Sequence, residues 1–336
     1  MSTNPVNIGL LGHRWGVWLR SHSGLYEVWC NRVQNVEPTF NAPTTKFYQL
    51  GSVDPTGVVT EPTEFRVTLE ENLHNAAIDN IVANGSGSPT AVFSVGDMVN
   101  SSAMRLSLVG RDIGGTNPTS EYILDTLTIA ELRYRYVIGG ACSVNYTFEG
   151  KSGNTYTSGS IVHTTWGTFE TTSPGAINGK DARIFFGAGL TVPATSQAYR
   201  LQSFEIRVAF PVQTVKELGN RAIVGTLSDV PDITCDFDLL AADHQPIDVW
   251  HAISGSGYDM GTQNTTNVFI EVFDPAAAEA TTILKSFRIE NCIPTTGTIV
   301  RAQVRALATR RYSLTSKFAT TANTSGLSIF SGSAPS

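Results

Sequence analysis

One stretch occurs twice in the chain, and this repeat constrains the fold more than any other feature. Residues 32–57 and 200–225 match without a gap. An ungapped series of matches at half the chain length predicts a tandem duplication of one domain. The matched pairs are Arg32 and Arg200, Gln34 and Gln202, Gly51 and Gly219, and Gly57 and Gly225, each 168 residues apart in a chain of 336 residues.

The duplication sets the domain boundaries that we expect. A chain of 336 residues is long enough for about two domains, each with a core of its own. We place the first domain at residues 1–150, a connecting segment at 151–180, the second domain at 181–318 and a C-terminal tail, extended or disordered, at 319–336.

Composition indicates a mainly β chain without a nucleic-acid-binding surface. Charged residues make up 15% of the sequence, below the roughly 25% of typical soluble domains. Gly, Ser, Thr and Asn are frequent, as in short strands joined by turns. The net charge of −6 argues against a broad phosphate-binding surface, which needs an excess of Lys and Arg.

Two strands with the same alternation stand 168 residues apart. Period two places apolar residues on one face of a strand and polar residues on the other. The polar face is mostly acidic in both copies. Phe65, Val67 and Leu69 alternate with Glu64, Arg66, Thr68 and Glu70, and Ile233, Cys235 and Phe237 alternate with Asp232, Thr234, Asp236 and Asp238.

Other segments complete the expected domain. Residues 47–60 and 215–228 are predicted to form long hairpins, and residues 73–82 and 246–253 short helices. A later match pairs residues 123–129 with 283–289 at an offset of 160. The apolar positions expected for the final strand of each copy are Val144, Tyr146 and Phe148, and Ala302, Val304 and Ala306.

The sequence contains no constellation that predicts catalysis or cofactor binding. The six histidines form no metal-binding pair, and no nucleophile elbow, P-loop or dinucleotide fingerprint occurs. The acidic residues of the second strand do not have the spacing of an EF-hand calcium site. We therefore expect no enzyme activity, no metal and no cofactor. Cys30, Cys142, Cys235 and Cys292 are scattered without a C-x-x-C motif, and we expect them to be small buried side chains.

Two groups of arginines leave two interpretations open. Residues 132–136 alternate arginine with apolar or aromatic side chains, and a second group lies near the end of the chain. Such a mixture of cationic and aromatic side chains is typical of a surface that binds nucleic acid. In an acidic chain, ion pairs between subunits are the favoured interpretation, since arginine is enriched at interfaces. The second group consists of Arg301, Arg305, Arg310 and Arg311.

The order of elements resembles the tail tube proteins of tailed bacteriophages and related secretion-system tube proteins. The resemblance covers most of residues 12–150 and 181–317, and no single motif in it is diagnostic. It is carried by residues 181–186 leading into 200–204, the turn 217–221, and residues 283–289.

This resemblance implies a β-sandwich or half-open barrel flanked by one short helix. It also implies six such domains per ring, stacked rings, and an inner sheet that lines a channel for DNA. Because this chain carries two domains, a ring would be a homotrimer with pseudo-sixfold symmetry. The implied location is the virion tail, assembled in the host cytoplasm. The implied partners are other copies of the chain, a hub, a terminator and a sheath, with passing double-stranded DNA that is not specifically bound and no membrane segment.

Site residues follow from this interpretation as expectations. An acidic channel wall repels phosphates, so that DNA slides without adhering. We assign that wall to Glu64, Glu70, Asp232, Asp236 and Asp238. Contacts between subunits are expected at the hairpins and near the late arginines, namely at Gly51, Gly57, Gly219, Asn220, Arg221, Gly225, Arg301 and Arg305.

Two alternative functions remain. A tail hub or tube-initiator protein would share the domain and form one ring without a polymer. A carbohydrate-binding tail protein would use exposed tryptophans to stack on sugars. Its candidate residues are Trp15, Trp18, Trp29, Trp166 and Trp250, although their patterned settings favour core positions.

Overall fold

The computed structural model describes the sheets and one helix in detail. It covers residues 15–21, 27–30, 33–41, 44–50, 53–60, 64–72, 77–84, 92–95, 98, 104–111, 118–137, 140, 142–150, 155–157, 163, 182–187, 201–216, 223–240, 265–273, 282–297, 309–316 and 326–331.

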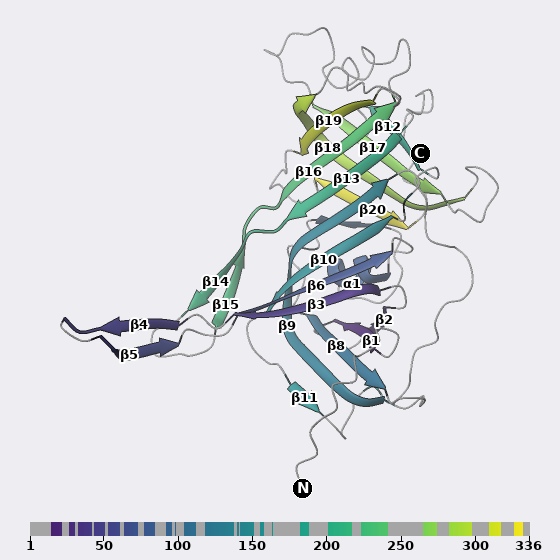
Figure 1. The fold of residues 1–336 in the computed structure, drawn as a ribbon. Coiled ribbons are helices and arrows are strands. Elements are labelled where there is room, and N and C mark those ends of the chain that lie inside the picture. Colours follow the sequence, from purple (N-terminus) through teal and green to yellow (C-terminus); the bar gives the residue numbers. More distant parts are fainter. Residues whose placement is uncertain are drawn as a thin grey trace.

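The protein is mainly β, as predicted, and its strands are antiparallel (Figure 1). Among the described elements the first half contributes one helix, which contacts β1, β2 and β7. The elements of this half are β1 (Trp15–Arg20), β2 (Glu27–Trp29), β3 (Val33–Asn41), β4 (Thr44–Tyr48), β5 (Pro55–Thr60), β6 (Glu64–Asn72), α1 (Ala77–Asn84), β7 (Val92–Ser94), β8 (Met104–Arg111), β9 (Pro118–Val137), β10 (Ser143–Gly150) and β11 (Thr155–Thr157).

The second half repeats the strand order of the first. Its elements are β12 (Ala182–Gly187), β13 (Leu201–Ala209), β14 (Val212–Lys216), β15 (Ile223–Ser228), β16 (Asp232–Leu240), β17 (Thr266–Phe273), β18 (Ile283–Gly297), β19 (Thr309–Ser316) and β20 (Leu327–Ser331). The pairing order is β1-β8-β9-β10-β6-β3 in the first half and β12-β17-β18-β19-β16-β13 in the second. Within the described residues, the two halves therefore share one topology.

One long strand in each half carries a sharp irregularity at the same place. Thr126 in β9 and Asn291 in β18 have positive φ angles of 57° and 52°, in the left-handed region that non-glycine residues seldom adopt. Before this point β9 pairs with β8, and after it with β10. Likewise β18 pairs first with β17 and then with β19. Each irregularity marks the place where a strand passes from one set of partners to another.

These irregularities correct one expectation from the sequence. They align β9 with β18 at an offset of 165, because 291 − 126 is 165. The match at 160 is therefore wrong by five residues, and its similar letters reflect two buried strands with similar patterns. Ala302, Val304 and Ala306, expected in the final strand of the second half, lie outside the described residues, and the strand that pairs with β16 is β19. Tyr312 and Leu314 are the buried apolar residues of β19.

The two halves are joined into one sheet. β13, an end strand of the second half, pairs with β9 of the first half, with Ile206 opposite Tyr134. The C-terminal strand β20, which lies in the segment assigned to the tail, is extended and pairs with both β18 and β7. Residues of both halves thus lie side by side, and both halves share a hydrophobic core.

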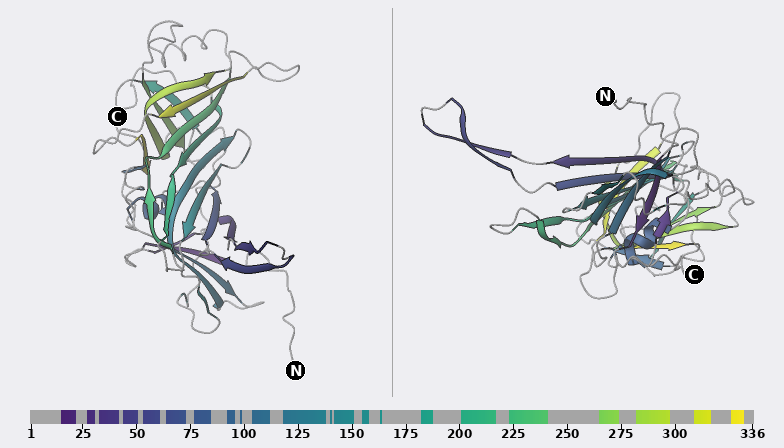
Figure 2. Two further views of the ribbon diagram at one scale, coloured as in Figure 1. Left: turned by 90° about the vertical axis from the view of Figure 1, so that its left-hand side faces the viewer. Right: turned by 90° about the horizontal axis from the view of Figure 1, so that it is seen from below.

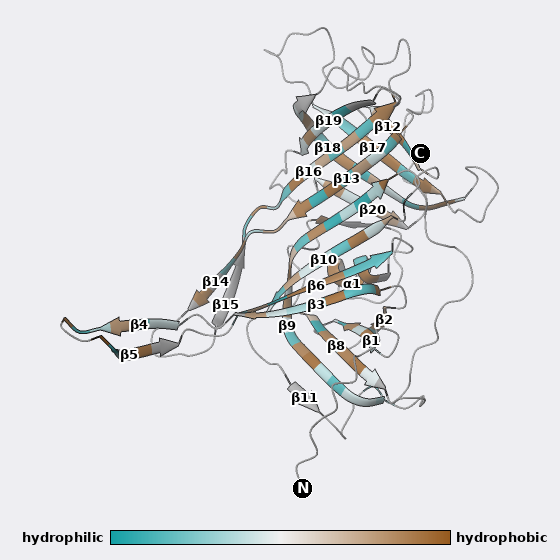
Figure 3. Cartoon of the chain, in the orientation of Figure 1, coloured by the Kyte–Doolittle hydropathy of each residue, from teal (hydrophilic) through white to brown (hydrophobic). Residues whose placement is uncertain are grey.

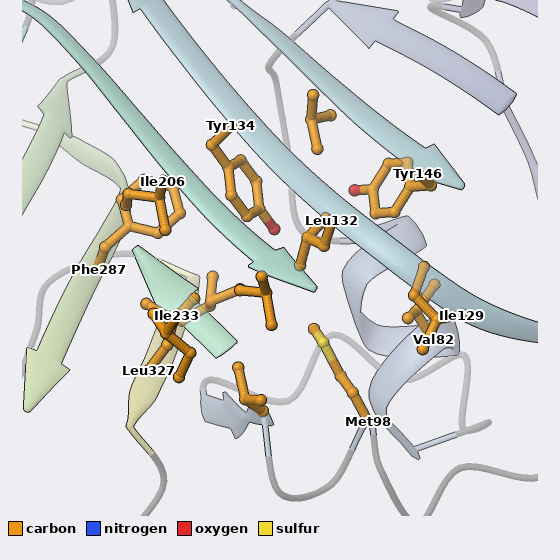
Figure 4. Close-up of a cluster of buried hydrophobic side chains, with 14 of the residues drawn as sticks. Val82, Met98, Ile129, Leu132, Tyr134, Tyr146, Ile206, Ile233, Phe287 and Leu327 are labelled. Carbon is orange, nitrogen blue, oxygen red and sulfur yellow. The ribbon is translucent and has the colours of Figure 1, made fainter. Parts of the chain in front are cut away.

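The core lies on the apolar face of the sheet. The alternation expected for β6 and β16 is confirmed, since their odd-numbered residues are buried and the even-numbered ones are more exposed. Figure 3 shows the same alternation of hydropathy along the paired strands. In Figure 4, side chains of both halves converge, and the rings of Tyr134 and Phe287 lie 4.8 Å apart. The ring centroids of Phe204 and Phe287 lie 6.0 Å apart.

Both predicted hairpins are present, and they extend away from the body of the protein (Figures 1 and 2). β4 pairs with β5, and β14 pairs with β15, in sheets of their own. The helix expected at residues 73–82 corresponds to α1, which ends at Asn84. The helix expected at residues 246–253 lies outside the described residues.

Gly150 at the end of β10 is required by its cross-strand neighbour. It lies opposite Phe65, and a Cβ atom at position 150 would lie 1.9 Å from Cζ of the Phe65 ring. We expect Gly150→Ala to lower the free energy of unfolding by about 1–3 kcal/mol, because the buried ring must move. Urea denaturation measures the effect. The control is Gly57→Ala, where nothing lies within 4 Å, and a similar loss there would contradict this explanation.

Candidate functional site

One polar face runs across the join between the two halves. It is formed by the outward side chains of β19, β16, β13, β9, β10, β6 and β3, which are neighbours in the sheet. Carboxylates outnumber guanidiniums on it, nine to five among the described residues. The carboxylates are Glu37, Glu64, Glu70, Glu131, Glu149, Glu205, Asp232, Asp236 and Asp238, and the guanidiniums are Arg66, Arg133, Arg135, Arg207 and Arg311.

Two ion pairs cross the join on this face. Arg133 Nη2 lies 2.8 Å from Glu205 Oε2, and Arg207 Nε lies 2.9 Å from Glu131 Oε1. Each pair links β9 of the first half to β13 of the second. The hydrogen bond that Arg133 donates to Glu205 raises the pKa of Arg133. Because these side chains are partly exposed, each pair contributes little to stability, but together they fix the register of the join.

Two further guanidiniums also lie close to carboxylates. Arg311 lies 3.5 Å from Asp236, and Arg66 lies 3.9 Å from Glu131. The hydroxyl of Ser203 donates to Asp238 at 2.8 Å. The pKa of Glu149 is raised, mainly by burial and also by the charge of Glu64, although the charge of Arg66 opposes this shift. Four of the five arginines of this face therefore lie close to carboxylates, while the face as a whole keeps an acidic excess.

The predicted acidic residues all lie on this face. Glu64 and Glu70 are on β6, and Asp232, Asp236 and Asp238 are on β16, with their side chains partly or fully exposed. The role of Glu131 and Glu205 was not predicted from the sequence, because it depends on the contact between β9 and β13. Alternating charges in residues 131–135 and 205–207 were the available signal.

Only two of the residues expected at contacts between subunits lie in the described part of the chain. Gly57 lies in β5, with open space around it, and Gly225 lies in β15. Gly51, Gly219, Asn220, Arg221, Arg301 and Arg305 lie outside the described residues. The first hairpin and its base carry most of the exposed large apolar side chains of the described chain. These are Phe40, Phe47, Tyr48, Leu50, Val53 and Val58, with Leu50 and Val53 almost fully exposed.

A fully buried ion pair connects the two halves on the opposite, apolar side. Asp79 of α1 is bonded to Lys285 of β18 and accepts a hydrogen bond from Tyr134, and neither charged side chain is exposed. The hydroxyl of Tyr146 donates to the same carboxylate at 2.7 Å. The ammonium of Lys285 lies 4.7 Å from the centroid of the Tyr134 ring. Burial, and secondly the charge of Asp79, raises the pKa of both tyrosines.

A second buried polar cluster holds part of the connecting segment against the first half. The ring nitrogens of His163 lie 2.6 Å from Glu121 and 2.6 Å from Glu27. The ring stacks on Trp18 at 4.9 Å, and Trp18 meets Trp29 edge to face at 5.0 Å. These two tryptophans therefore pack in the protein. Trp166 and Trp250 lie outside the described residues.

The four cysteines are free and buried, as expected. Burial raises the pKa of Cys292 to about 12 and those of Cys30 and Cys235 well above their usual value. Across the described ranges, no group of three or more His, Cys, Asp or Glu residues could hold a metal ion. In that same part of the chain, no helix has the length and apolar character needed to span a membrane.

Comparison with known proteins gives partial structural similarities. No protein-family model matches the chain. No curated protein matches it in sequence. The chain is similar to a chain of the PVC extracellular contractile injection system, solved as its extended sheath–tube complex, with 9% identity and a TM-score of 0.32 over 42% of this chain and 87% of the other.

Two further solved structures match in the same way. A chain of the tube-terminating cap of the anti-feeding prophage has 13% identity and a TM-score of 0.31, over 48% of this chain and 95% of its own. An Hcp protein has 13% identity and a TM-score of 0.23, over 44% of this chain and 96% of its own. Each match covers less than half of this chain.

Removing one partner of the buried ion pair should destabilise the protein strongly. Asp79→Asn leaves the Lys285 charge buried without its counter-ion, and we expect a loss of about 3–5 kcal/mol in the free energy of unfolding. The double variant Asp79→Asn/Lys285→Met should recover much of that loss, because no charge is left uncompensated. Chemical denaturation of both single variants and the double variant measures the coupling. Strictly additive losses would contradict the pair's proposed role.

Proposed function

We propose that the chain is a structural protein of a phage-type tail tube. Three copies form a ring, rings stack into a tube, and the polar face lines a channel through which DNA passes during ejection. The observation that supports this most directly is the join between β13 and β9, in which two equivalent halves pair head to tail.

A head-to-tail join has consequences for assembly. It uses one edge of the first half and a different edge of the second, so the chain still carries one edge of each kind. Contacts of this type repeat by rotation and close into a ring, or else continue as an open filament. Closure removes exposed sheet edges, which otherwise pair with unintended partners. The six domains per ring implied by the sequence resemblance correspond to three chains.

The polar face has the electrostatics that a DNA channel requires. Its carboxylate excess repels phosphates, and the ion pairs of Arg133 and Arg207 occupy guanidiniums that could otherwise bind them. A surface that holds DNA shows the reverse, an excess of unpaired Lys and Arg. We infer that DNA would pass along this face without adhering to it.

A structural role also agrees with the buried polar clusters. Asp79 and Lys285 have no exposed surface, so a substrate cannot reach them. Their bonds connect the two halves instead. We therefore propose that the chain is not an enzyme.

Negative-stain electron microscopy of the purified protein tests this function. We expect rings with an axial hole, or tubes of stacked rings, and analytical ultracentrifugation should give a ring mass of three chains. Single rings that never stack would favour the hub or tube-initiator alternative. Monomers, or particles without a hole, at high protein concentration would overturn the proposal.

The first hairpin is proposed to make ring-to-ring contacts, because its exposed apolar side chains need a partner surface. The double variant Leu50→Ser/Val53→Ser should leave folding unchanged and shorten the tubes or abolish them. The matched control is Val137→Ser, which removes an exposed apolar side chain outside the hairpins. Tube lengths are measured by electron microscopy and folding by circular dichroism. Long tubes from the hairpin variant would contradict the assignment.

A further inference from the structure

We propose that Asp79 and Lys285 join each other through an amide between their side chains, an isopeptide bond, once the two halves have folded together. The bond connects Nζ of Lys285 to Cγ of Asp79 and releases one water molecule. It ties α1 of the first half covalently to β18 of the second, across 206 residues of chain. This inference goes beyond the proposed function and does not depend on it.

The fold holds the two reacting groups against each other. Nζ of Lys285 is bonded to Oδ2 of Asp79, and neither side chain has any exposed surface. The backbone of Lys285 is fixed on both sides, because β18 pairs at this residue with β17 and with β20. Asp79 is held by α1, in which Ile81 and Val82 are fully buried. Well-oriented groups within one molecule react as if at roughly 10⁵–10⁸ M, so no enzyme is needed to bring them together.

Burial removes the charges that normally prevent this reaction. In water an ammonium has no free electron pair and a carboxylate resists attack, so lysine and aspartate remain an ion pair. An apolar interior disfavours both charges, since each loses its hydration. Transfer of one proton from Nζ to Oδ2 leaves a neutral amine beside a neutral carboxylic acid. The rings of Tyr134 and Phe287, with centroids 4.7 Å and 5.8 Å from Nζ, exclude water from the amine.

Two tyrosines divide the carboxyl group into a carbonyl oxygen and a leaving oxygen. The hydroxyls of Tyr134 and Tyr146 both donate to Oδ1 of Asp79, while Nζ of the lysine occupies Oδ2. Figure 4 shows both rings with their hydroxyls turned toward the same region. Oδ1 gains negative charge when the amine adds to Cγ, and donors aimed at such an oxygen stabilise the transition state. Both hydroxyls stay protonated, because burial, and secondly the charge of Asp79, raises the pKa of each tyrosine.

The reaction balances without an oxidant or a reductant. Nζ first gives one proton to Oδ2 and then attacks Cγ, so that a C–N bond forms and the C=O electron pair moves to Oδ1. A second proton passes from Nζ to Oδ2, the Cγ–Oδ2 bond breaks, and Oδ2 leaves with that electron pair as water. The pair on Oδ1 forms the carbonyl again, and Nζ keeps one hydrogen. One neutral amide thereby replaces two buried charges, which removes the desolvation cost of the ion pair.

The ion pairs on the polar face lack these features. Arg133 with Glu205 and Arg207 with Glu131 are partly exposed, so water reaches them. A guanidinium also stays protonated in proteins and provides no neutral nitrogen for attack. These contacts remain ion pairs, and the contact between Lys285 and Asp79 differs from them in every property that the amide requires.

Mass spectrometry of the intact, denatured native chain tests the bond. We expect a mass that is lower than the sequence mass by one water molecule. Trypsin should fail to cut after Lys285, whose charge is lost, and should release residues 67–105 linked to residues 222–288. A native chain at the full sequence mass would overturn the proposal. A loss of water without this branched peptide would also overturn it, since dehydration elsewhere gives the same mass.

Two variants test the chemistry. Lys285→Arg is the matched control, because it keeps a cation beside Asp79 but has no amine to acylate, and it should show its full sequence mass. Tyr146→Phe removes one donor to Oδ1 and should slow formation of the bond by about 10²–10³-fold. The linked fraction is followed by mass against time after synthesis, in protein that circular dichroism shows to be folded. An unchanged rate would refute the part assigned to the tyrosines, and the result for the native chain requires neither variant to fold.

The outcomes are separate from those of the proposed function. Rings without the branched peptide would overturn the amide alone, and the branched peptide in a chain that forms no rings would overturn the tube alone. The stability loss expected for Asp79→Asn refers to the chain before the bond forms. Its native reference is therefore newly folded protein that still has the full sequence mass.

Discussion

The structure depends on the ladder between β13 and β9, because it turns a duplicated sequence into one sheet. Without it, each half would expose a sheet edge and part of its apolar face. The ladder aligns the two polar faces, so that carboxylates of both halves line one surface and Arg133 reaches Glu205. It also brings Tyr134 and Phe204 against Phe287. The shared core and the shared polar face thus have one cause.

The buried pair of Asp79 and Lys285 adds specificity to this join. A buried ion pair seldom stabilises a protein more than apolar residues of the same size, since both charges lose their hydration. The pair instead destabilises alternative arrangements of the two halves, because any arrangement that separates α1 from β18 leaves a buried charge without a partner. Tyr134 and Tyr146 both donate to Oδ1 of the carboxylate, while Lys285 binds Oδ2. The pair belongs to the internal join and links residues 206 positions apart.

The sequence predicted those parts of the fold that depend on local pattern. The alternation in β6 and β16, both hairpins and the offset of 168 depend on neighbouring residues, and the structure has them. The offset of 160 was wrong because two apolar strands resemble each other in several registers, and only the bends at Thr126 and Asn291 distinguish them. The role of Glu131 and Glu205 was not predictable, since it arises from contact between strands distant in sequence. The sequence pattern alone overstated the acidity of the face, because it did not show which arginines pair with the carboxylates.

Duplication within one chain lowers the entropic cost of the internal join. Two domains on one polypeptide meet at a high effective concentration, so the ladder between β13 and β9 forms without the entropic cost of association between separate chains. The ion pairs at this join therefore serve alignment and not recruitment.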